Sequence, residues 1–158
     1  MSDEWGDFPR GHAEDVELFL DWLDYLRRAV IRKLDGVTDE QAHVRPNDAL
    51  ISLVGIVNHL THVEWRWIDG AIRGDSVARR EDEFTPGVEL TIAGAVEAYR
   101  ARAEATDAFV RKTPLDTPTN EGQRTDLRWV LLHLINETAR HAGHADATRE
   151  LLDGTTGE

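Results

Sequence analysis

The sequence contains no cysteine, which excludes disulfides, thiolate metal sites and a cysteine nucleophile. It also has no apolar run near the roughly 20 residues that span a bilayer, so we expect no membrane partner. The first five residues, Met1 to Trp5, are acidic and lack a hydrophobic stretch. We therefore expect no secretory signal and a cytoplasmic location.

Positive charge is scarce. There are 18 Lys and Arg against 30 Asp and Glu, a net charge of −12 with histidine neutral. Such a surface repels phosphate backbones, which argues against nucleic-acid binding. Only two basic residues, Lys33 and Lys112, are lysine, and this arginine bias indicates a GC-rich genome.

No segment of useful length alternates apolar and polar residues with period two, so the sequence predicts no strands. Apolar residues recur at helical spacing in four stretches, and caps and breakers suggest their ends. The 158 residues predict one all-α domain, a four-helix bundle with long crossover connections. We expect long helices over 16–34, 52–74, 91–112 and 125–153, and a short helical turn from Thr38. The connections are a long loop over 74–90, whose charge run at 79–83 we expect to be solvated, and a second loop over 114–124. An arm over 1–12 and a frayed tail over 154–158 complete the chain.

Polar residues border the buried face of the fourth predicted helix. His133, Glu137, His141 and His144 are spaced four, four and three residues apart, so they share one side of the helix, next to its apolar stripe. On the second predicted helix, His59 is surrounded by apolar residues and faces inward. Imidazoles and a carboxylate at the inner edges of a bundle are costly unless something satisfies them.

A divalent metal would satisfy this group. Glu137 and His141 are one turn apart and can reach one ion, and His59 would be a third donor from the facing helix. Two histidines and a carboxylate leave coordination positions open, as in catalytic sites. His144, His133 or Arg140 could support the ligands. The alternatives are a satisfied core histidine and an ordinary surface Glu/His pair.

Other candidates are weaker. His12 and His43 are expected on the surface, and His62 either near the site or on the surface. Arg66 could reach an anionic substrate or form a surface ion pair. The tryptophans at 65, 67 and 129 are expected to pack rather than to form a ligand platform. The sequence has neither a Gly-rich phosphate loop nor the His-Glu-x-x-His motif.

Two segments carry a family resemblance. Residues 52–60 (SLVGIVNHL) and 127–146 (LRWVLLHLINETARHAGHAD) resemble the second-helix and last-helix signatures of the DinB superfamily, in the branch that includes mycothiol-dependent transferases. Members are four-helix bundles, often dimeric, and many bind a divalent ion. The resemblance thus implies metal ligands at His59 and His141 and a homodimer.

The ligand four residues before His141 is histidine in many members. Here it is Glu137, as the resemblance to mycothiol-dependent maleylpyruvate isomerase supports. His144 lies outside the common trio and is expected either as an added ligand or as a catalytic proton carrier. Zinc is the expected metal, with nickel and iron as alternatives.

The implied chemistry is that of a borrowed low-molecular-weight thiol, with mycothiol favoured by the arginine bias. The thiolate would attack a small electrophile, giving S-transfer or isomerisation. Two alternatives stay open: a non-enzymatic metal-binding or stress-response protein of this fold, and a metal-free bundle whose polar stripe serves packing.

Overall fold

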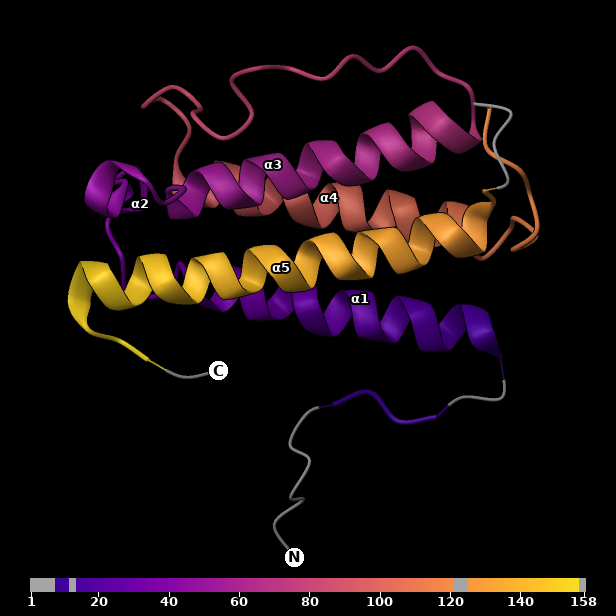
Figure 1. Ribbon diagram of the computed structural model, residues 1–158, viewed down its shortest axis with the longest axis horizontal. Coiled ribbons are helices and arrows are strands. Elements are labelled where there is room, and N and C mark those ends of the chain that lie inside the picture. The colour runs from indigo at the N-terminus through magenta and orange to yellow at the C-terminus, as the bar shows by residue number, and fades with distance from the viewer. Residues whose placement is uncertain (1–7, 12–13, 121–124, 157–158) are drawn as a thin grey trace, which may run out of the picture.

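The computed structural model describes residues 8–11, 14–120 and 125–156. Within these ranges the chain is helical, and the only β-type pairing is an isolated bridge between Pro118 and Asp126. The prediction of an all-α fold is confirmed (Figure 1). The elements are α1 Asp15–Arg32, α2 Asp39–Ala42, the 3₁₀ turn η1 Pro46–Asp48, α3 Leu53–Trp65, the π-helical η2 Arg66–Ile72, α4 Ile92–Val110 and α5 Leu127–Asp153.

Local capping chemistry begins the three later long helices. The side chains of Ser52, Thr91 and Asp126 each accept a hydrogen bond from the backbone N–H three residues on, which satisfies a donor left free at a helix start. Thr38 and Gln41 form a reciprocal capping box on α2. Gly154, with φ of 74°, ends α5 in the left-handed conformation that glycine favours.

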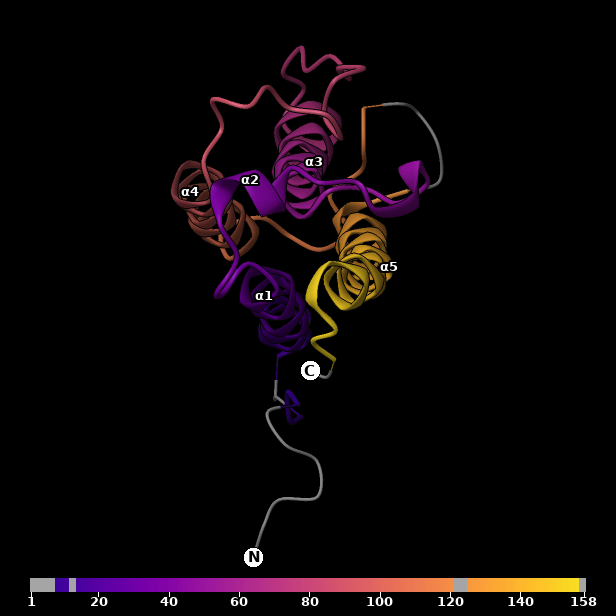
Figure 2. The same ribbon diagram turned by 90° about the vertical axis from the view of Figure 1, so that its left-hand side faces the viewer.

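The four long helices stand at the corners of a square when viewed along the bundle (Figure 2). Helix α1 packs mainly on α5, and α3 mainly on α4. Figure 1 shows that α3 and α4 run in the same direction, opposite to α1 and α5. The connection over 73–91 must therefore return along the length of the bundle, and it does so beside α3. This segment is the long crossover that the sequence predicts.

A charged layer divides the apolar core. One apolar cluster lies around Val30 and Leu60, and a second around Leu23 and Leu131. Between them, the buried Arg27 donates to both carboxylate oxygens of Glu64 at 2.7 and 2.8 Å, and to Asp107 at 3.0 Å. Burial opposes the charge of Arg27, but its two carboxylate partners outweigh this and hold its pKa above the ordinary value.

Near the two ends of the chain, the structure describes residues 8–11 and 154–156 outside the helices. Of the predicted N-terminal arm, Phe8 packs against Trp22 and Tyr25 on α1. Residues 1–7, His12 and Ala13 lie outside the described residues, as do 157–158 of the predicted tail. In the part of the chain that the structure describes, no helix is long and apolar enough to cross a bilayer.

Candidate metal centre

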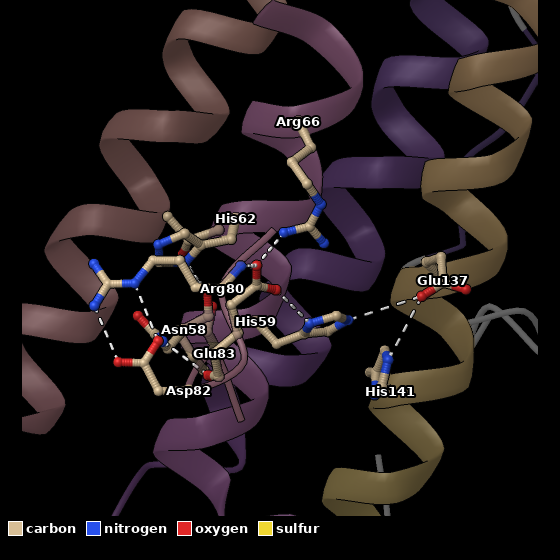
Figure 3. Close-up of polar contacts among 11 residues, drawn as sticks. Asn58, His59, His62, Arg66, Arg80, Asp82, Glu83, Glu137 and His141 are labelled. Carbon is tan, nitrogen blue, oxygen red and sulfur yellow. Dashed lines mark hydrogen bonds and ion pairs between the residues drawn. The ribbon is translucent and has the colours of Figure 1, made fainter. Parts of the chain in front are cut away.

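Three predicted ligands meet between α3 and α5. Glu137 Oε2 lies 3.9 Å from His59 Nε2 and 3.6 Å from His141 Nε2, and one donor atom from each residue lies within 4.8 Å of the others (Figure 3). Both histidines are buried, and Glu137 is half-buried. Ligand atoms that share a tetrahedral ion at about 2.1 Å lie roughly 3.4 Å apart, so the group has suitable donors at nearly suitable spacing.

His59 is held in one orientation by two contacts. Its Nδ1 lies 3.0 Å from Glu83 Oε2. Since a carboxylate accepts, Nδ1 carries the proton and donates it, which leaves Nε2 as the lone-pair nitrogen toward Glu137. The Phe84 ring stacks on the imidazole at 3.9 Å between centroids. Burial lowers the pKa of His59 despite the opposing effect of Glu83, so the ring is neutral at pH 7 and able to bind a metal.

Glu83 is itself held by several groups. Its carboxylate pairs with Arg66 and accepts from the backbone N–H of Arg80 at 3.2 Å, and its carbonyl accepts from Asn58 Nδ2 at 2.8 Å (Figure 3). Burial disfavours the charged form of Glu83. The Arg80 N–H, the Arg66 charge and the His59 N–H outweigh this and keep its pKa below the ordinary value. Glu83 is therefore an ionised partner for His59.

The buried position of Glu83 corrects the expectation that the whole charge run at 79–83 is solvated. Arg80 and Asp82 are exposed and pair with each other at 3.0 Å, but Glu83 is only 2% exposed. Gly55 permits this, because a Cβ at that position would lie 2.2 Å from the carbonyl oxygen of Phe84. The missing side chain lets the crossover approach α3 closely enough for Glu83 to reach His59.

His141 is joined to the fourth histidine of the polar stripe. Its Nδ1 lies 3.2 Å from Nδ1 of His144, so one ring donates and the other accepts. Burial and repulsion from His59 lower the pKa of His141 to about 4, which makes it neutral at pH 7. With Nε2 of His141 facing Glu137, Nδ1 is the nitrogen left to carry its proton and to donate to His144.

A cavity of about 760 Å³ adjoins the three donors. His133 and His144 of α5 line it together with Arg66 and Trp67 of η2. The π-helical winding was not predicted, although π-helical turns often occur at functional sites. Arg66 forms an ion pair, as one of the two predictions for it states, but its partner is the buried Glu83 rather than a surface group. A cavity of this size can hold a small-molecule ligand.

The remaining predicted residues lie elsewhere or play other parts. The structure does not bring His133 into the donor group; its ring packs against those of Trp67 and Trp129. Arg140 is exposed, with its guanidinium 3.7 Å from Glu137. His62 donates to the carbonyl of Asn58 and His43 to that of Leu90, and both are half-buried. The expectation of a surface position for His43 was thus only partly right.

Comparison with solved structures supports the fold. The structure is similar to a crystal structure described as the conserved protein of locus from Enterococcus faecalis, with a TM-score of 0.72 and 14% identity over 91% of this chain and 100% of that one. At this identity the likeness shows the fold alone. Comparison with curated proteins gives no significant match.

A family model described as mycothiol-S-transferase matches residues 18–154, which include the candidate centre and all of the four long helices except the first three residues of α1. The resemblance to the DinB-like branch of mycothiol-dependent transferases is thereby confirmed. The chain belongs to the mycothiol-S-transferase family.

Proposed function

We propose that this protein is a metal-dependent enzyme that uses mycothiol for S-transfer to, or isomerisation of, a small electrophile. The observation that carries the proposal is the convergence of His59, Glu137 and His141 beside a cavity of about 760 Å³. Membership of a family named for mycothiol transfer supports the choice of thiol.

The donor set favours an open metal site. Two neutral imidazoles and one carboxylate leave coordination positions free for a ligand, as in catalytic zinc sites. We take zinc as the first candidate, with nickel and iron suited to the same donors. Bound there, such an ion supplies the positive charge that favours the thiolate form of an added thiol.

The chain's own residues would then orient the ligands and move the proton. Glu83 fixes the tautomer of His59, and the Nδ1–H of His141 donates to His144. In the proposed reaction this hydrogen bond opens, and the freed Nδ1 lone pair of His144, which lines the cavity, takes the thiol proton. The sulfur forms a bond to the electrophilic carbon, and His144 returns the proton to the leaving group or to the carbanion.

Metal content and thiol turnover test the proposal together. Untagged protein purified without added metal is expected to hold about one ion per chain. His59→Ala should lose it, and the matched control His43→Ala should retain it because His43 lies outside the centre. Conjugation of mycothiol to a model electrophile such as monochlorobimane should fall by about 100-fold or more after metal removal.

His144→Ala separates the two roles considered for His144: retained metal with turnover lowered about 100-fold indicates a proton carrier, and lost metal indicates a ligand. Equal turnover after complete metal removal would contradict the mechanism. A bound ion without thiol turnover would favour the non-enzymatic metal-binding protein. Failure to bind zinc, nickel and iron on reconstitution would favour the metal-free bundle.

A further inference from the structure

An aromatic surface extends from the cavity and plays no part in the metal centre. It consists of Trp67, His133 and Trp129, which we call the aromatic wall. The His133 and Trp129 rings lie nearly parallel, with centroids 5.2 Å apart and planes at 6°. Trp67 packs against both, at 4.7 Å from His133 and 5.3 Å from Trp129. Trp67 and His133 line the cavity, and Trp129 continues the wall outside it.

The wall is not simply the end of the apolar core. Trp129 is 41% exposed, although one of the largest apolar side chains would be expected to bury more of its surface if packing were its only role. Aromatic faces at the mouth of a cavity are typical of ligand-binding surfaces. The wall therefore provides contact area that the fold itself leaves unused.

Helical geometry aligns the wall with the metal centre. Trp129, His133, Glu137 and His141 follow one another at intervals of four residues on α5. Each interval advances about 6 Å along a helix axis. The wall thus begins about 6 Å from Glu137 along α5 and ends about 12 Å from it.

Polar groups lie on the same cavity. Asp75 and Arg79 of the crossover line it, as does Asn120 of the connection before α5. The backbone N–H of Asn120 donates to Ala71 at 2.7 Å, and its side-chain amide donates to the carbonyl of Gly70 at 3.1 Å, so its position beside η2 is fixed. An aromatic face beside a carboxylate, an amide and a guanidinium matches a ligand with apolar C–H faces and many hydroxyls. A sugar ring has this chemistry.

We propose that the aromatic wall, with Asp75 and Asn120 beside it, binds the sugar portion of the thiol while the sulfur lies at the metal centre. This inference rests on the proposed function, because mycothiol carries its cysteine on an amino sugar joined to inositol. About five bonds separate the sulfur from the sugar ring, an extended reach of roughly 6 Å. A sulfur near Glu137 would therefore place the sugar ring beside His133 and Trp129.

Calorimetric titration with the thiol-free amino sugar–inositol conjugate tests the subsite without any need for turnover. Wild-type protein is expected to bind it, and Trp129→Ala should weaken the affinity about tenfold, the loss typical of one stacking contact. Trp129→Phe, which keeps an aromatic face, should recover most of the affinity. Trp65→Ala is the matched control, because Trp65 is equally exposed at 42% but packs against His62, away from the aromatic wall.

Turnover with two thiols separates failure of this inference from failure of the proposed function. Trp129→Ala should raise the KM for mycothiol about tenfold and leave kcat/KM for N-acetylcysteine, which lacks the sugar, unchanged. Wild-type protein that binds the conjugate but turns over neither thiol would overturn the proposed function and keep the subsite. The subsite is overturned if wild type does not bind the conjugate, if Trp129→Ala binds it as tightly as wild type, or if the variant changes only the KM for the electrophile.

Discussion

His141 makes the stability of the folded chain sensitive to acid. Its side chain is buried beside a second imidazole, and both features lower its pKa, to about 4 from the ordinary 6.5. At neutral pH the ring is therefore neutral and its Nε2 lone pair is available toward Glu137. Below pH 6.5 the unfolded chain binds a proton at this histidine that the folded chain resists, so acid must weaken the fold.

This gives a prediction for the metal-free protein. The free energy of unfolding, from urea denaturation in the presence of chelator, should fall as pH is lowered from 6.5 to about 4, with His141 contributing on the order of 2–3 kcal/mol. In His141→Asn this part of the pH dependence should be absent. Identical profiles for wild type and His141→Asn would contradict the assignment.

At the level of elements, we expect the candidate metal centre to depend on how closely the crossover approaches α3. Gly55 should therefore matter for metal affinity although it contacts no ligand. Gly55→Ala is compatible with a helix but would force Phe84 outward and loosen the Glu83–His59 hydrogen bond. Removing a partner that orients a ligand commonly costs about 10–100-fold in metal affinity, and we expect a loss in this range from competition with a chromophoric chelator.

Two further variants complete this test. Glu83→Gln should lower metal affinity in the same direction, because it replaces the ionised acceptor of the His59 Nδ1–H with a neutral one. Gly143→Ala is the control, since a Cβ there would meet no described atom within 4 Å. Unchanged affinity in Gly55→Ala would show that the approach of the crossover does not support the centre.

The elements also show which features the sequence could reveal. The helix starts at Ser52, Thr91 and Asp126 were predictable because capping acts over three residues. The polar stripe of α5 was predictable because it repeats within one helix. Glu83 was missed because its partner lies in another element and its neighbours are solvated charges; the one local signal was a glycine inside a helical pattern. The π-helical winding of η2 has no comparable signature in residues 66–72.

At the scale of the whole molecule, binding of an ion should raise the thermal stability of the protein. An ion that binds only the folded chain stabilises it by about 2.7 kcal/mol at a free concentration of 100 times Kd. For a protein of this size that corresponds to a rise in Tm of roughly 5–10 °C. Calorimetry with added zinc should show this rise in wild type and not in Glu137→Gln. An equal rise in both proteins would place the ion elsewhere.

The three donors come from two helices that are far apart in the sequence. His59 is on α3, whereas Glu137 and His141 are on α5, and η2, the crossover and α4 all lie between them in sequence. A shared ion would close this long segment into a loop, the situation in which a cross-link restricts an unfolded chain most strongly. In a chain without cysteine no disulfide can do this. Metal retention would then show that α3 and α5 have packed together in their native arrangement.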